Sequence, residues 1–153
     1  MGVVRIMAEL IAATSLAGIV AFVAWSWNSL PARIPVHFNI HGQPDSWGGK
    51  DFLIVLPVLA AFTYGILSLV QRKPQWMNVP FAVDLNDSEV RAQLGEMACV
   101  LKACVLILLF ITVWAMVQVA NGNATGLPAG FLPIALLLPI LPTAIYLAKL
   151  KRP

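Results

Sequence analysis

The run ACVLILLFITVWAMVQVA, residues 103–120, decides the fold class, because it holds no charged residue and approaches the length of a membrane span. A helix needs about 20 apolar residues to cross the ~30 Å hydrocarbon core of a bilayer. Three further apolar runs lie at residues 6–27, 52–71 and 127–148. Soluble domains carry roughly 25% charged residues; this chain of 153 residues carries 11% and is 59% hydrophobic. The sequence therefore predicts an all-α membrane protein with four transmembrane helices.

The third helix is expected to begin well before residue 103. Asn86-Asp87-Ser88-Glu89 is typical of an N-cap with a capping box, with Asn86 opening the motif. A helix over residues 87–120 measures about 51 Å and exceeds the hydrocarbon core. Its first turns are therefore expected to lie outside the membrane. With a structured loop at residues 28–51, the four helices form a single domain over residues 1–153.

The distribution of basic residues sets the expected orientation. Seven Lys and Arg residues fall on one side of the four spans, namely Arg5, Arg72, Lys73, Arg91, Lys149, Lys151 and Arg152. Only Arg33 and Lys50 fall on the other side. Cytoplasmic loops carry the excess of basic residues, so both termini are expected in the cytoplasm. Topology also accounts for the pI near 9.1, which is therefore no sign of a nucleic-acid partner.

Small residues recur at four-residue spacing in the first helix. They are Ala13, Ala17 and Ala21, with Gly18 beside them. Such a pattern lets two helices approach closely in lipid. This seam is expected to face protein, either within the chain or in a homo-oligomer or complex with another membrane protein.

One carboxylate lies inside the first apolar run. Glu9 follows Arg5 by one helical turn near the cytoplasmic end, which favours an ion pair between the two at the membrane interface. The alternative is a proton or cation carrier, because a carboxylate is costly inside a membrane and such residues mark ion pathways.

The stretch LPARIPVHFNIHGQPDSWGGK, residues 30–50, gathers both histidines of the chain in one loop. Apolar and polar side chains alternate within it, with Val36, Phe38 and Ile40 on one side and His37, Asn39 and His41 on the other. Alternation of this kind predicts a short strand with an apolar and a polar face. Gly42-Gln43-Pro44 then turns the chain and brings Asp45 back.

Three interpretations of the polar face remain open. His37, His41 and Asp45 carry ring nitrogens and a carboxylate that could bind a divalent metal. Alternatively, Asn39 and Asp45 hydrogen-bond the loop backbone and need no ligand. In the third interpretation, the face recognises an external peptide or a lipid headgroup. No GxSxG, HExxH or P-loop motif is present in the sequence, so an enzyme would lack its usual residues.

This loop resembles a known signature. The matching positions are Leu30-Pro31, Ile34-Pro35, His37-Phe38-Asn39, Gly42, Pro44-Asp45, Trp47 and Lys50. The pattern is similar to domain-of-unknown-function family 1648, a bacterial membrane domain also found at the head of SdpI-type immunity proteins. The resemblance covers the first two helices and their loop. It implies a bacterial inner-membrane protein and marks His37, Asn39, Asp45 and Lys50 as candidate ligand-binding residues; His41 is less typical of the motif.

The favoured function is a non-enzymatic binding, sensing or immunity-type protein, because SdpI-type proteins protect a cell from a secreted peptide toxin and signal to a cytoplasmic repressor. A second hypothesis is a small accessory or assembly subunit of a larger membrane complex. A third is a metal-dependent membrane enzyme or transporter. The expected partners are membrane lipids, other membrane proteins or a second copy of the chain, and an external peptide; no cofactor is expected.

The charge distribution makes a direct prediction of topology. Cysteine labelling from either side of the membrane should find Ser46 outside, and Asn78 and both termini inside. An external C-terminus would contradict the four-span arrangement, because an even number of spans returns the chain to the side on which it starts.

Overall fold

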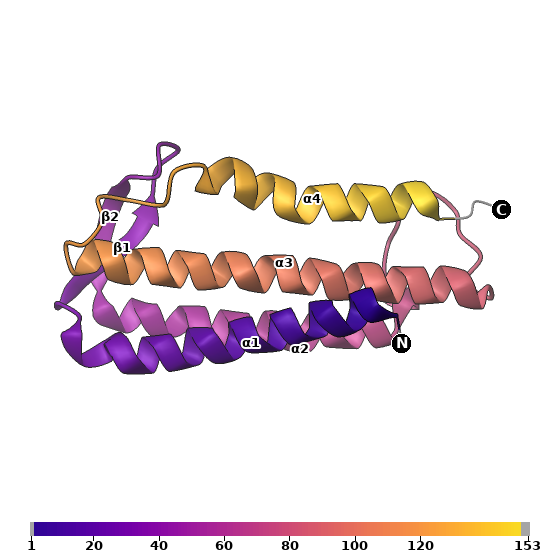
Figure 1. Cartoon of the computed structure of the whole chain (residues 1–153), viewed down its shortest axis with the longest axis horizontal. Coiled ribbons are helices and arrows are strands. Elements are labelled where there is room, and N and C mark those ends of the chain that lie inside the picture. The colour runs from indigo at the N-terminus through magenta and orange to yellow at the C-terminus, as the bar shows by residue number, and fades with distance from the viewer. Residues whose placement is uncertain (1, 151–153) are drawn as a thin grey trace.

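The computed structural model describes residues 2–150 and shows a bundle in which successive helices run in opposite directions (Figure 1). The described residues contain four helices long and apolar enough to cross a membrane: α1 (Val3–Ser26), α2 (Val55–Arg72), α3 (Ser88–Ala120) and α4 (Phe131–Lys149). The predicted all-α membrane fold is confirmed. Short 3-10 turns flank these helices at Trp27–Ser29, Lys50–Ile54 and Pro74–Trp76.

The helix ends differ from the predicted ends by a few residues. The cap of α3 is Asp87 rather than Asn86, because the Asp87 carboxylate accepts a hydrogen bond of 2.7 Å from the backbone N–H of Glu89. Helix α4 begins at Phe131 instead of residue 127, because Gly130 has a φ of 78° and interrupts any helix that starts earlier. Helix α1 begins at Val3, before the predicted residue 6.

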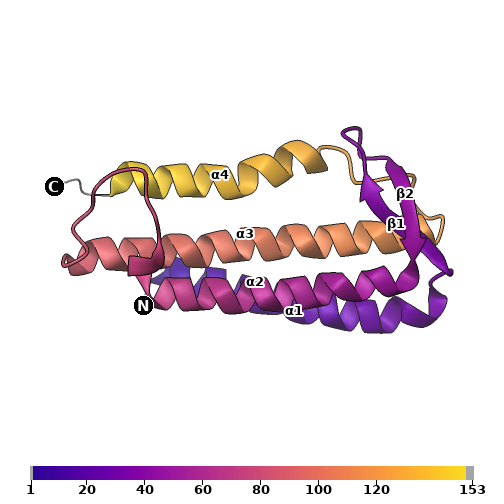
Figure 2. The ribbon, with the colours of Figure 1, turned by 180° about the vertical axis from the view of Figure 1, so that it is seen from behind.

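Helix α3 lies at the centre of the bundle. It packs against α1 and α2 on one side and against α4 on the other, as opposite views agree (Figures 1 and 2). The other helices leave large apolar side chains exposed, including Phe62 on α2 and Leu136 on α4. In a membrane these side chains face lipid, so their exposure carries no hydrophobic cost.

The face of α1 that packs inside the molecule differs from the predicted seam. Ala13, Ala17 and Ala21 are exposed, and only Gly18 lies against a neighbour, the ring of Phe110. The buried residues of α1 are instead Ala8, Ala12, Ile19, Val23 and Ser26. Small residues line both faces of this helix, so their spacing alone did not tell which face meets α3.

The first turns of α3 are covered by protein. Val90, Leu94 and Met97 form a second small core with Leu150. The side chains that close this core come from the segment between α2 and α3 and from the end of α4: Met77, Val79, Phe81, Val83, Leu85, Tyr146 and Leu147. The segment before α3 therefore acts as a cover for the end of the bundle.

Helices α2 and α3 approach closely at Gly95. A Cβ atom placed at this position would lie 2.8 Å from the carbonyl oxygen of Gln71. Only glycine allows this approach without displacement of the last turn of α2. The contact also holds Gln71 where its side chain reaches into the bundle.

Gly95→Ala is expected to lower the stability of the purified protein by about 1–3 kcal/mol, the usual cost of overpacking. The matched control is Gly65→Ala on α2, where an added Cβ meets nothing within 4 Å. The control should be neutral or stabilising by up to about 1 kcal/mol, because alanine favours helix. Thermal unfolding in detergent measures both, and equal effects of the two substitutions would refute the close approach at Gly95.

Candidate functional site

The loop between α1 and α2 is a two-stranded antiparallel hairpin. Its strands are β1 (Arg33–Phe38) and β2 (Pro44–Gly49), joined by a turn in which Gly42 has a φ of 75°. The predicted alternation holds up to Phe38 but not at Ile40, which lies beyond the strand and is 82% exposed. Strand β2 was not predicted, because proline and two glycines make its sequence a poor strand former.

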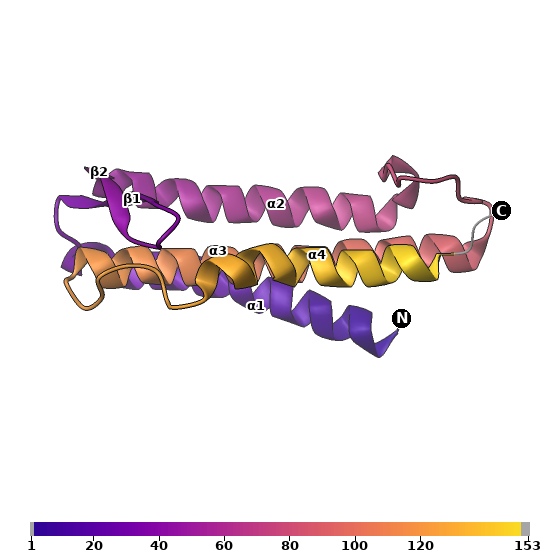
Figure 3. The ribbon, with the colours of Figure 1, turned by 90° about the horizontal axis from the view of Figure 1, so that it is seen from above.

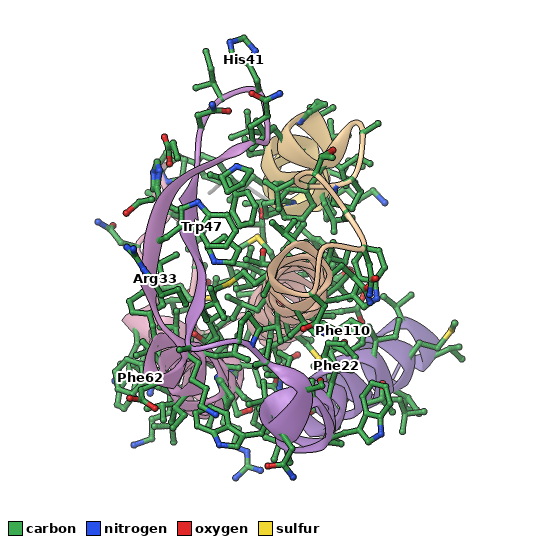
Figure 4. All side chains as sticks on the ribbon, turned by 90° about the vertical axis from the view of Figure 1, so that its left-hand side faces the viewer. Phe22, Arg33, His41, Trp47, Phe62 and Phe110 are labelled. Carbon is green, nitrogen blue, oxygen red and sulfur yellow. The ribbon has the colours of Figure 1, made fainter. Side chains whose placement is uncertain are left out.

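The hairpin is anchored at both ends. At its base, Leu30 and Ile34 are buried in the main core, with Phe38 packed beside them. At its tip, the carbonyl oxygen of Gly42 accepts a hydrogen bond of 2.7 Å from the backbone N–H of Leu127 in the α3–α4 loop. The hairpin is therefore held at its base and at its tip, at one end of the bundle (Figure 4).

Two of the predicted residues form a pair on the outside of this hairpin. Nδ1 of His37 lies 2.5 Å from Oδ1 of Asp45. An ionised carboxylate only accepts hydrogen bonds, so Nδ1 carries the proton and donates it. The side chains are 68% and 42% exposed, respectively. The pair is thus preformed and open to a ligand.

Asn39 has a different role, in the turn itself. Its Oδ1 accepts hydrogen bonds from the backbone N–H groups of His41, at 2.9 Å, and Gln43, at 3.1 Å. Its backbone N–H also donates to the carbonyl oxygen of Gln43 at 2.9 Å. Asn39 therefore closes the turn, as the backbone-bonding interpretation expected of it.

The remaining two candidates lie away from the pair. His41 sits at the tip of the hairpin with its ring pointing outward (Figure 4). Lys50 follows the end of β2 at the base, where its Nζ lies 5.0 Å from the ring centre of Trp27. Within residues 2–150 no three His, Cys, Asp or Glu side chains are grouped to hold a metal. The three-ligand site of His37, His41 and Asp45 is therefore not assembled, because the Gly42 turn carries His41 past the pair.

A second polar group lies between the helices and was missed by the sequence analysis. Lys102 of α3 is fully buried, and its ammonium donates to both oxygens of Glu9, at 3.0 and 2.8 Å. It also donates to Oγ of Ser68 at 2.9 Å and to Oε1 of Gln71 at 3.1 Å. We call this group, together with Tyr64 and Cys99, the Glu9–Lys102 network.

The carboxylate of Glu9 receives hydrogen bonds from every helix around it. Besides Lys102, it accepts from the hydroxyl of Tyr64 at 2.6 Å, Nε2 of Gln71 at 3.2 Å and Sγ of Cys99 at 3.4 Å. The predicted ion pair with Arg5 is wrong, because the buried ammonium on α3 takes that place. The network joins α1, α2 and α3.

The spacing of polar residues in the apolar helices was the available signal. Tyr64, Ser68 and Gln71 recur at i, i+4 and i+7, and Cys99 and Lys102 at i and i+3. Each set therefore shares one helix face. A rise of about 1.5 Å per residue puts Glu9 about 26 Å from Ser26, the end of α1 nearest the hairpin. That distance places the network near the edge of a ~30 Å hydrocarbon core, on the side away from the hairpin.

Comparison with known proteins connects the hairpin to a family. The chain is 29% identical over 76 residues to an uncharacterized protein of Archaeoglobus fulgidus, an alignment that covers 44% of this chain and 41% of that protein. The chain thus spans less than half the length of this relative. No solved structure matches this chain. Residues 14–61 match the family model described as domain of unknown function DUF1648. The resemblance seen in the loop is confirmed by this match, which takes in most of α1, the hairpin and the start of α2.

Proposed function

We propose that this integral membrane protein is a non-enzymatic binding protein that recognises an external ligand through the outer face of its hairpin. The observation that carries the proposal is the exposed His37–Asp45 pair on an anchored support within the DUF1648 domain. Sensing and immunity are the roles in which such a face would act, and the basic flanks favour the plasma membrane with the hairpin outside.

The energetics of the pair favour recognition over a structural role. An exposed ion pair contributes roughly 0–1 kcal/mol to stability, so the fold gains little from His37 and Asp45. The buried side of the hairpin, with Ile34 fully buried, supplies its stability instead. A polar pair that the fold does not need, held in fixed geometry, is suited to a ligand.

A peptide fits the surroundings of the pair. Among the described residues, no third strand pairs with the two strands of the hairpin, so an extended peptide can add to an open edge. Ile40 is exposed beyond the end of β1 and offers an apolar contact. Nε2 of His37 and the second oxygen of Asp45 remain for side chains or termini of the peptide.

Assembly into a larger complex is a second candidate, supported by a separate observation. The seam of Ala13, Ala17 and Ala21 is exposed on α1 and runs along its lipid-facing side. Small residues at this spacing allow close helix packing in lipid. The same face would serve a second copy of the chain or another membrane subunit.

Photocrosslinking in intact cells of the source organism separates the two. A photoreactive residue at Ser46, which pairs with His37 across the hairpin, should yield an adduct of defined mass. His37→Ala and Asp45→Ala should weaken the adduct at least about tenfold, as for loss of a binding anchor. Their unfolding free energy should change by less than about 1 kcal/mol. A photoreactive residue at Ala17 tests assembly in the same cells.

Asn39→Ala is the structural control, because it leaves the turn N–H groups of residues 41 and 43 without their acceptor. This variant should lose the adduct, and its unfolding free energy should fall by about 1–3 kcal/mol. An adduct at Ser46 that persists in both His37→Ala and Asp45→Ala would contradict recognition by the pair. An adduct at Ala17 alone would favour the assembly subunit.

A further inference from the structure

A polar cleft of about 370 Å³ lies between α1 and α2, beside the Glu9–Lys102 network. Its walls come from these two helices alone: Arg5, Glu9, Tyr64, Ser68, Gln71 and Arg72. The N-terminal end of α1 diverges from α2 at this level (Figure 3). The cleft does not belong to the hairpin, which lies at the opposite end of the bundle.

Two guanidinium groups in the cleft lack an anionic partner. Within residues 2–150 the salt bridges are His37–Asp45 and Lys102–Glu9, so neither Arg5 nor Arg72 is paired. Nε of Arg5 is buried and, among the described atoms, has no hydrogen-bond acceptor. The guanidinium of Arg5, which lines the cleft, is therefore left to pair with an anion there through its other N–H groups.

The other polar groups of the cleft are already engaged or can assist. Glu9 uses its oxygens on Lys102, Tyr64 and Gln71, so its negative charge is largely offset. Ser68 accepts from Lys102 and retains its own hydroxyl hydrogen as a donor. The net charge of the cleft, with Lys102 behind it, is positive.

The depth of the cleft selects the kind of anion. Glu9 lies near the cytoplasmic edge of the hydrocarbon core. Arg5 lies one turn beyond Glu9 on α1, and Arg72 one turn beyond Ser68 on α2, both toward the cytoplasm and at the level of the headgroups. Guanidinium groups bind phosphate with paired N–H donors. Basic pockets between helices on the cytoplasmic side bind anionic headgroups.

We propose that this cleft binds a phosphate group through Arg5, Arg72 and Ser68, supplied by the headgroup of an anionic phospholipid or by free phosphate. The two sources present the same chemistry to the arginines. A phospholipid additionally places its acyl chains along the apolar faces of α1 and α2. Phosphatidylcholine is disfavoured, because its quaternary ammonium lies next to the phosphate and is repelled by both guanidinium groups.

The test uses the purified full chain in a neutral detergent. Its thermal unfolding is titrated in three arms with phosphatidylglycerol, phosphatidylcholine and inorganic phosphate. The variants are Arg5→Gln and Arg72→Gln, and the matched control is Lys73→Gln, which removes a neighbouring charge outside the cleft. Native mass spectrometry counts the lipids retained by each variant, which keeps the test independent of any loss of stability.

Phosphatidylglycerol should raise the Tm of the wild type and of Lys73→Gln, and its apparent Kd should rise about tenfold with each arginine removed. If inorganic phosphate raises the Tm as much as phosphatidylglycerol does, and the rise depends on the arginines, the site is assigned to free phosphate. The proposal is overturned if neither ligand shifts the Tm, or if phosphatidylcholine acts as strongly as phosphatidylglycerol. It is also overturned if phosphatidylglycerol raises the Tm of the wild type but the arginine variants retain as much of it as the wild type.

Discussion

The buried ammonium of Lys102 is the constraint on which the helical core depends. A charged group in a hydrocarbon environment has to find acceptors, because no water is there to solvate it. Lys102 finds them on two other helices, at Glu9 of α1 and at Ser68 and Gln71 of α2. Apolar packing in lipid leaves helices free to slide and rotate past one another, since lipid tails are as apolar as their side chains. The network removes that freedom and sets one register for α1, α2 and α3.

The rest of the molecule is built around that three-helix core. Gly95 lets the end of α2 come close enough to α3 for Gln71 to enter the network. At the opposite end, the hairpin packs on the core through Ile34 and joins the α3–α4 loop through Gly42 and Leu127. Helix α4 has no buried residue. Of the other three long helices, it makes substantial contact only with α3. The two polar sites thus lie at opposite ends of α1 and α2, both positioned by the same three helices.

The sequence predicted the features that depend on local pattern. Apolar runs gave the number of spans, and the cluster before Ser88 gave the start of α3 to within one residue. Features that depend on helix rotation were not predicted: the partner of Glu9 and the face of α1 that packs inward. Apolar side chains line every face of α1, so composition does not distinguish its lipid-facing side from its buried one. The second strand was also missed, because β2 owes its conformation to pairing with β1 rather than to its own proline- and glycine-rich sequence.

A double-mutant cycle of Glu9→Gln and Lys102→Met tests the central claim most directly. Unfolding free energies of the wild type, both single variants and the double variant are measured in the same detergent. Each single change should be strongly destabilising, because it leaves one charged or polar group without its partner. The double variant should lose less than the sum of the two, with a coupling of about 1–3 kcal/mol. Additive losses would show that the two groups do not interact and that some other contact sets the register of α1, α2 and α3.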